Sequence, residues 1–250
     1  MKTIARVESF FLDGEYQDGP TEVRVLLPEK TAKGARHPVM YLLPVEPGPS
    51  SRYGDPVREA VVHGVANGYG VICVEPTFTE WPWYCDHATN PKVRQESHML
   101  NVVLPFVEGN FPATAAPEGR LLLGFSKSGW GAFSLILRHP DVFGKAAAWD
   151  APMTRNEMKP EWGMSCAFGT EGNFKRYQIL RALKASAGRF TGAPRLFLMG
   201  HGNCKECLDA THEEMVRLGM AHEYRKGPRR EHNWVSGWFP EAVDWLMRKG

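Results

Sequence analysis

Five short apolar runs, separated by longer amphipathic segments, limit what this chain can fold into. The runs are VMYLL (39–43), VICVE (71–75), LLLGF (121–125), AAAWD (146–150) and RLFLMG (195–200). Each run is short and continuously apolar, which predicts a strand buried on both faces rather than a half-exposed one. Such strands occur in mostly parallel sheets that helices cover on both sides. The chain is therefore expected to form an α/β fold.

The segments between these runs complete the predicted fold. Amphipathic patterns predict helices over 56–67, 92–109, from about 128, over 206–218 and over 239–248. Residues 4–12 and 21–27 predict two strands at an antiparallel edge, and 222–227 predict a last short strand. No linker or repeat interrupts the sequence, so we expect a single domain, 1–250. The stretch 151–172 lacks clear periodicity, and because long loops are often functional, it is a candidate lid.

Composition narrows the class of protein and of partner. The formal net charge is +2, and 43% of the residues are hydrophobic, as in ordinary globular proteins. The basic cluster of Lys226, Arg229 and Arg230 is short and interrupted, so nucleic-acid binding is not expected. No apolar run reaches the ~18 residues that cross a bilayer. Arg6 and Glu8 interrupt the stretch that a signal peptide keeps apolar, so we expect a cytoplasmic protein without membrane contact.

The five cysteines are odd in number, so they cannot all pair, which favours a reducing compartment. Cys204 and Cys207 form a C-x-x-C motif, with His201 and His212 close by in the sequence. A structural zinc site usually has two such ligand pairs, and a redox C-x-x-C needs a thioredoxin-like context. The sequence predicts neither a metal site nor a cofactor.

The segment GFSKSG (124–129) stands where a buried strand runs directly into a helix. A sharp turn of this kind exposes a serine hydroxyl at the strand end and faces it with N–H groups of the helix start. The usual pattern is G-x-S-x-G, and Ser128 stands here in place of its last glycine. Serine is small enough to fit there. Ser126 is therefore the predicted nucleophile, and the alternative is a serine that only caps the helix.

Longer sequence segments between Pro38 and the C-terminus add to the evidence from the Ser126 turn. They are PVMYLLP, WYCDHATNPKVRQESHMLNVVLPFVEGNFP, GFSKSGWGAFSLILRHPDVFGKAAAWDAP and EHNWVSGWFPEAVDWL. Together they resemble the α/β-hydrolase group of esterases that includes esterase D, feruloyl and acetylxylan esterases and the mycolyltransferases. The resemblance covers roughly 200 residues, far more than a five-residue motif. It implies the α/β-hydrolase fold and a serine nucleophile that acts on esters.

The resemblance also implies a base and an acid. His232 matches the block in which the family carries its histidine, last in the chain order. The family's aspartate follows the strand 195–200, but this chain has Asn203 there, and an amide carries no charge. Asp150 is our first choice, because some lipases of similar architecture carry their acid at the end of the preceding strand. Glu206, Asp209 and Asn203 remain alternatives.

The oxyanion hole is predicted from two loops. One donor would be the backbone N–H of Lys127, and the second would come from Val45 or Glu46 after the strand 39–43. The family's His-Gly is replaced here by Pro44-Val45, and proline has no N–H to donate. The Glu46 carboxylate would repel an oxyanion unless it turns away or pairs with a cation such as Arg52.

Eight tryptophans are many for this length, and most fall in the loops that follow the predicted strands. The carboxyl edge of such a sheet forms the ligand crevice, and aromatic walls suit a sugar face or an aromatic acyl group. Some of these rings are expected to serve the core instead. The predicted substrate-binding residues are Trp81, Trp83, Tyr84, Trp130, Trp149, Trp162 and Trp234.

Together these residues predict a serine carboxylic-ester hydrolase that acts through an acyl-enzyme. Its expected substrate is a small-molecule or carbohydrate ester, with a sugar-linked, aromatic or short acyl group. Two alternatives remain open: an acyltransferase of the same fold, and a binding module that keeps the fold without the chemistry. The replacements at Pro44, Ser128 and Asn203 favour the binding module, whereas the Ser126 and His232 blocks favour an enzyme.

Overall fold

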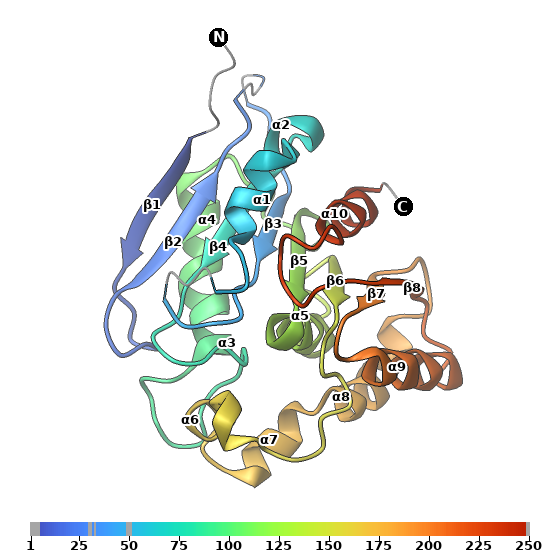
Figure 1. The fold of residues 1–250 in the computed structure, drawn as a ribbon. Coiled ribbons are helices and arrows are strands. Elements are labelled where there is room, and N and C mark those ends of the chain that lie inside the picture. The colour runs from blue at the N-terminus through green and yellow to red at the C-terminus, as the bar shows by residue number, and fades with distance from the viewer. Residues whose placement is uncertain (1–5, 30–31, 33, 49–51, 249–250) are drawn as a thin grey trace.

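An eight-stranded sheet forms the centre of the structure, a computed structural model that describes residues 6–29, 32, 34–48 and 52–248 (Figure 1). The spatial strand order is β1-β2-β4-β3-β5-β6-β7-β8. β2 pairs antiparallel with β1 and β4, and the other neighbours are parallel, so the predicted mostly parallel sheet with an antiparallel edge is confirmed. The strands are β1 (Val7–Leu12), β2 (Thr21–Leu26), β3 (Val39–Leu42), β4 (Ile72–Pro76), β5 (Arg120–Phe125), β6 (Lys145–Trp149), β7 (Leu196–His201) and β8 (Glu223–Arg229).

The central strands are apolar throughout because side chains leave both faces of the sheet into separate hydrophobic layers. In β3, Val39 and Tyr41 enter one layer, while Met40 and Leu42 enter the other. The helices of the second layer are α1 (Pro56–Val62), α2 (Val65–Tyr69) and α10 (Phe239–Met247). The first layer contains α4 (Leu104–Asn110), α5 (Ser126–Arg138), α8 (Ile179–Ser186) and α9 (Lys205–Arg217).

Two predicted helices are divided in the structure. The helix expected over 56–67 is divided, because α1 ends with His63 as its cap and Gly64, with a φ of 60°, stands directly before α2. The helix expected over 92–109 starts at Gln95 as α3 (Gln95–His98) and continues through a π-helical turn, η1 (Met99–Val103), into α4. The strand expected over 4–12 is described from Val7, since residues 4 and 5 lie outside the described residues.

The stretch 151–172 is not the irregular loop that its lack of periodicity predicts. It contains a 3₁₀ turn, η3 (Pro160–Trp162), and a short helix, α6 (Met164–Phe168), and leads into α7 (Glu171–Tyr177). Met164, Ala167 and Phe168 are buried at the i, i+3, i+4 spacing of a helix face, too short a pattern to stand out in sequence. Figure 1 shows α6 and α7 together at the end of the molecule away from both termini. A lid role for this segment stays a prediction.

Parallel pairing brings the predicted site residues together at one edge of the sheet. Phe125 at the end of β5 lies opposite Trp149 at the end of β6. Ser126 and Asp150 follow directly, so both lie at the carboxyl edge, where ligands bind in open α/β sheets. Two further 3₁₀ turns, η2 (Pro117–Gly119) and η4 (Ala187–Arg189), precede β5 and β7 in the chain. Among the described helices, none has the length and apolar character needed to cross a bilayer.

Candidate active site

Ser126 occupies a strained turn between β5 and α5. Its φ is 52°, in the left-handed region that non-glycine residues rarely adopt. The turn is so tight that a Cβ at Gly124 would lie 2.3 Å from the carbonyl oxygen of Ser128, so only glycine fits there. Ser128 is buried, and its hydroxyl accepts from the N–H of Phe125 (3.1 Å) and donates to the Phe125 carbonyl (2.9 Å). The replacement at 128 therefore ties the turn together rather than disrupting it.

Asp150 and His232 meet at the carboxyl edge of the sheet. The Asp150 Oδ2 lies 2.5 Å from His232 Nδ1, and Asp150 is fully buried. The carboxylate also accepts the backbone N–H of Asn203 (2.8 and 2.9 Å to its two oxygens) and of Cys204 (2.7 Å). Asp150, like Ser126, has a positive φ, of 46°. Of the acids considered from the sequence, Asp150 is the one that the structure places against His232.

The surroundings of Asp150 keep it ionised. Burial alone would raise its pKa, but the hydrogen bonds from His232 and from the backbone of Gly202, Asn203 and Cys204 outweigh burial and lower it. A Cβ at Gly202 would lie 2.6 Å from Asp150 Oδ2, so glycine permits this close backbone approach.

The other candidate acids lie elsewhere. Asp209 binds the side chains of Lys205 and Tyr224, and Glu206 is exposed at the start of α9. Asn203 contributes its backbone N–H to Asp150, as described above, rather than a side-chain contact with His232. The family's position for the acid thus supports the carboxylate here through its backbone.

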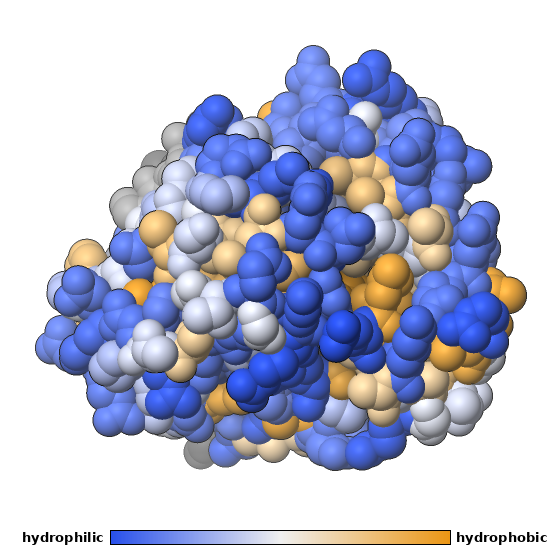
Figure 2. Space-filling view, turned by 90° about the horizontal axis from the view of Figure 1, so that it is seen from below, coloured by the Kyte–Doolittle hydropathy of each residue, from blue (hydrophilic) through white to orange (hydrophobic). Residues whose placement is uncertain are grey.

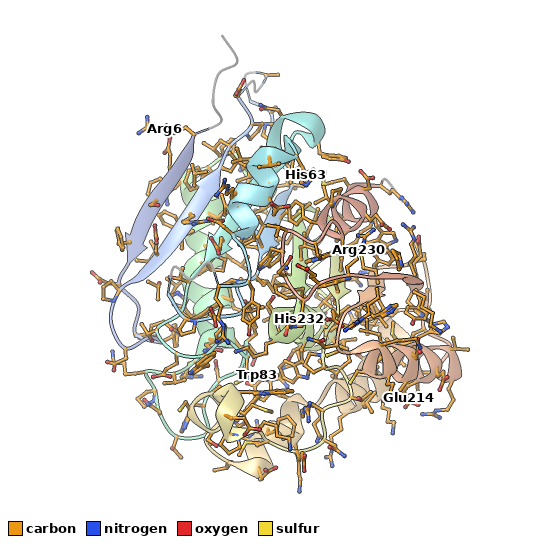
Figure 3. The ribbon with its side chains drawn as sticks, in the orientation of Figure 1. Arg6, His63, Trp83, Glu214, Arg230 and His232 are labelled. Atoms are coloured by element: carbon orange, nitrogen blue, oxygen red, sulfur yellow. The ribbon has the colours of Figure 1, made fainter. Side chains whose placement is uncertain are left out.

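Aromatic rings hold the His232 imidazole in place. The ring centroids of Phe125, Tyr53 and Trp149 lie 5.1, 5.9 and 6.2 Å from that of His232. The His232 side chain keeps 21% of its surface exposed, so one edge of the ring faces outward. Figure 3 shows His232 near the middle of the molecule, with the buried Trp83 between it and the α6 and α7 end.

One pocket of about 430 Å³, here called the Ser126 pocket, opens over these residues. It contains Ser126 and His232 and all three residues predicted for the oxyanion hole, together with two of the predicted tryptophans. Sequence reasoning did not assign Tyr53, Pro152 or Glu161 to a site, because they come from loops without a chemical motif. It considered Cys204 only as part of the C-x-x-C motif and not as a residue of this pocket. The lining residues are Val45, Glu46, Arg52, Tyr53, Trp81, Ser126, Lys127, Pro152, Glu161, Trp162, Asn203, Cys204 and His232.

Two hydrogen bonds to neighbouring segments hold the loop after β3 in place. The N–H of Leu43 extends the β3 and β5 ladder to the Leu123 carbonyl (2.9 Å), and the Tyr84 hydroxyl donates to the Pro44 carbonyl (2.6 Å). Glu46 pairs with Arg52 at 3.5 Å, one of the two arrangements expected to prevent repulsion of an oxyanion. On the other side, the N–H of Lys127 belongs to the first turn of α5, where helical N–H groups have no acceptor within the helix.

Five of the seven predicted substrate-binding aromatics do not line this pocket, which corrects the sequence expectation. Trp83, Tyr84, Trp130, Trp149 and Trp234 are at most 1% exposed and belong to the two hydrophobic layers. They support the site from behind: Trp130 and Trp149 belong to α5 and β6, and the loops that carry the other three pack back onto the sheet. For example, Trp83 donates its indole N–H to the Trp162 carbonyl (3.0 Å). Trp81 and Trp162 alone among the seven face the pocket.

The C-x-x-C motif lies at the start of α9, beside Asp150. Cys204 is the residue before the helix, and Cys207 follows in its first turn. The hydrogen bond from the Cys204 thiol lowers the pKa of Cys207 to about 6 against burial, with Thr154 contributing further hydrogen bonds. Of the other candidate metal ligands, His201 contacts the Lys226 carbonyl, and His212 contacts His222. Within the described ranges, no three His, Cys, Asp or Glu residues are grouped to hold a metal.

We expect Cys207 to react first among the cysteines with a small alkylating agent at neutral pH, since alkylation requires the thiolate. Cys73 and Cys85 are buried and their pKa values are raised by burial. The reactivity of Cys207 should fall as the pH drops through about 6. Mass spectrometry of peptides after brief iodoacetamide treatment would check this order. First labelling at Cys166, the exposed cysteine, would contradict it.

Comparison with known proteins identifies the family. The model of the family described as "Putative esterase" matches residues 15–187, more than half of the 250 residues. This chain belongs to that esterase family. The resemblance inferred from the sequence blocks is thus confirmed. Esterase Rv1288 of Mycobacterium tuberculosis (strain H37Rv) is 27% identical over 134 residues, which are 52% of this chain and 29% of that relative. The chain therefore spans less than a third of that relative's length.

Solved structures similar to this esterase family member confirm the α/β-hydrolase fold. A ferulic acid esterase superposes with a TM-score of 0.74 at 19% identity, covering 97% of this chain and 96% of its own. An S-formylglutathione hydrolase from Agrobacterium tumefaciens gives 0.79 at 16% identity, covering 99% and 96%. MPT51 of Mycobacterium tuberculosis gives 0.71 at 15% identity, covering 97% of each chain. At these identities the similarity establishes the fold.

Proposed function

We propose that this family member is a serine carboxylic-ester hydrolase with Ser126, His232 and Asp150 as its catalytic triad. The observation that carries the proposal is the 2.5 Å contact of Asp150 Oδ2 with His232 Nδ1, in a pocket that also contains Ser126 on its strained turn. A proton on Nδ1 satisfies the carboxylate and leaves the Nε2 lone pair to act as base. An activated serine requires an oriented base of this kind, and Ser126 lines the same pocket as His232.

In the proposed reaction, Ser126 Oγ attacks the ester carbonyl carbon while His232 Nε2 takes the hydroxyl proton. The carbonyl oxygen becomes an oxyanion, which the N–H of Lys127 and that of Val45 or Glu46 would stabilise. Pairing of Glu46 with Arg52 reduces the repulsion that a lone carboxylate would exert there. The C–O bond to the alcohol then breaks, and His232 returns its proton to the departing alkoxide.

Water completes the cycle by a second addition and elimination, in which water is the nucleophile and Ser126 is the leaving group. It attacks the acyl-enzyme carbonyl, His232 takes its proton, and the proton returns to Ser126 as the carboxylic acid leaves. The ionised Asp150 stabilises the imidazolium that forms twice in each turnover, since its pKa is lowered by His232 and three backbone N–H groups despite burial. No metal or cofactor enters this scheme.

We further propose short or aromatic acyl esters as substrates. A pocket of about 430 Å³ is at the lower end of the range for small-molecule sites, and Trp81 and Trp162 form its aromatic walls. With five of the predicted aromatic residues in the core, a broad sugar platform has less support than the sequence indicated. Figure 2, which views the α6 and α7 end, shows mainly hydrophilic side chains with separate hydrophobic patches between them.

A fluorophosphonate probe tests the proposal directly. Ser126 Oγ should displace fluoride from the probe's phosphorus, adding the phosphonyl group to the peptide that contains Ser126. Mass spectrometry should locate that adduct, and Ser126→Ala should abolish it. Hydrolysis should release free acid from p-nitrophenyl butyrate, whereas formation of a new ester with an added sugar would indicate an acyltransferase. Absence of both labelling and turnover would leave the binding module as the better explanation.

A further inference from the structure

Lys127 places an ammonium group in the wall of the Ser126 pocket, one residue after the proposed nucleophile. Its side chain is half-buried, and Nζ lies 4.0 Å from the centre of the Trp81 ring. Among the described residues no direct salt bridge of Lys127 is found, and the carboxylate that acts on it electrostatically is that of Glu46, in the loop after β3. Partial burial of a charge costs free energy, and Glu46 offsets only part of that cost, because the pKa of Lys127 is lowered overall. A side chain that only packed on Trp81 would not need that charge.

The charged groups that share the pocket with Lys127 are the Glu46 and Glu161 carboxylates and the Arg52 guanidinium. Glu46, the nearby carboxylate of the loop after β3, is paired with Arg52 at 3.5 Å. Glu161 of η3 lines the pocket but is exposed to solvent, so water screens its charge. The remaining titratable groups of the pocket are Tyr53, His232, which faces Asp150, and the Cys204 thiol, whose pKa is raised by its hydrogen bond to Cys207 and by burial.

A second cation lies against the other tryptophan of the pocket. The Arg155 guanidinium stacks over the Trp162 ring at 4.4 Å, and its Nε is buried without a hydrogen-bond partner among the described residues. Both tryptophans that line the pocket therefore carry a cation on one face. Two such cations near one pocket favour a ligand with negative charge.

We propose that Lys127 binds an anionic group, such as a carboxylate, that the ester substrate itself carries. The inference rests on the proposed esterase function and narrows its substrate class to esters with a negative charge close to the scissile bond. The negative charge must lie close to the scissile bond, because Lys127 is the next residue after Ser126 and its side chain lines the same pocket. The anion can belong to the acyl group or to the leaving alcohol, and the experiment separates these two cases.

The ionisation of Lys127 supports this assignment. The pKa of Lys127 is lowered to about 8. Burial is the main cause, the nearby Glu46 carboxylate partly opposes it, and the Arg52 guanidinium adds to it. The ammonium form is therefore complete well below pH 8 and is lost as the pH rises through about 8. Attraction for an anionic substrate should follow the ammonium form, so it should be present at neutral pH and decline in mildly alkaline solution.

Two matched substrate pairs locate the anion. In the first pair, mono-p-nitrophenyl adipate carries a carboxylate at the end of its acyl chain, and its neutral counterpart has an isopropyl group in place of that carboxylate. In the second pair, para-acetoxybenzoate carries the carboxylate on the leaving group, and para-isopropylphenyl acetate is the neutral counterpart. The readout is the ratio of kcat/KM values within each pair, which cancels effects common to both members.

We expect the wild-type protein to favour the anionic member of one pair at about pH 6.5. Lys127→Met keeps an unbranched side chain, one atom shorter, and removes its charge. It should lower that ratio at least ~10-fold, the size of a lost charge-assisted contact. Lys127→Arg should retain most of the preference. In the wild-type protein the preference should shrink at about pH 9.5, after subtraction of spontaneous hydrolysis.

Lys145→Met is the matched control. Lys145 also lies over a tryptophan, 5.3 Å from the Trp245 ring centre, and burial lowers its pKa, but it stands at the opposite end of β6 from Asp150. Its removal should leave both ratios unchanged. An unchanged ratio in Lys127→Met for both pairs, or no anion preference in the wild-type protein, would overturn the inference while neutral-ester turnover left the esterase proposal standing. No turnover of any of the four esters would overturn both.

Discussion

Ser126→Ala is expected to lower the turnover of p-nitrophenyl acetate or butyrate by at least ~10⁴-fold, as removal of an activated nucleophile does in other serine hydrolases. The melting temperature should change little, because the Ser126 side chain is only half-buried and no described hydrogen bond depends on its hydroxyl. Turnover of p-nitrophenyl esters and thermal unfolding, measured on the same preparations, check both parts. Retained turnover would refute the assignment of the nucleophile.

The strain at position 126 gives this prediction a second readout. Ser126→Gly should be as inactive as Ser126→Ala but more stable by about 1 kcal/mol in the free energy of unfolding, since glycine adopts the φ of 52° without cost. Ser134→Ala is the matched control, because Ser134 is a buried serine of the same helix, α5, outside the Ser126 pocket. It should keep its activity. Equal stability of the alanine and glycine variants would contradict the strained turn.

Asp150→Asn is expected to lower kcat by ~10⁴-fold, the scale seen when a triad acid becomes its amide. The Asp150 carboxylate accepts from His232 Nδ1 and from the N–H groups of Asn203 and Cys204. An amide has one oxygen for these donors, and its NH₂ group must face another donor. If the NH₂ faces His232, the imidazole takes the wrong tautomer, with its proton on the nitrogen needed as base.

Stability measurements must accompany that variant, because Asp150 is fully buried and an unmatched donor there costs about 1–3 kcal/mol. A folded protein with kcat reduced by orders of magnitude would support the assignment. Glu206→Gln and Asp209→Asn serve as controls and should be nearly silent in kcat, since neither carboxylate contacts His232. A large loss of kcat in either control, with Asp150→Asn active, would move the acid to the strand that the family normally uses.

The sheet and the order of its parts were predictable because local pattern carries that information. A strand buried on both faces must be apolar at every position, so β3, β5 and β7 stand out in the sequence as continuous runs. The strand-to-helix turn at Ser126 was also predictable, since a small residue at 124 is required for so tight a turn. Short elements such as α6 were not predicted, because five residues are too few to show a helical period.

The aromatic residues show the limit of sequence reasoning most clearly. Trp81 and Trp83 are two residues apart, yet one lines the Ser126 pocket and the other is buried against Trp130. The sequence predicted that both lie near the carboxyl edge of the sheet, because both belong to the loop that follows β4. The direction of each side chain depends on how the loop packs against α5 and α6, and that packing involves residues distant in the chain.

The sequence alone determined the α/β sheet and the Ser126 turn, because each depends on residues close together in the chain. Its resemblance to the esterase family supplied the α/β-hydrolase fold and the expectation of a terminal His232. Tertiary structure decided which carboxylate meets His232, since Asp150, Asn203 and His232 converge from three separate segments. It also decided that Lys127 shares a pocket with Trp81 and lacks an ion pair among the described residues. Contacts between distant segments form only when the sheet brings strand ends together, so no local pattern records them.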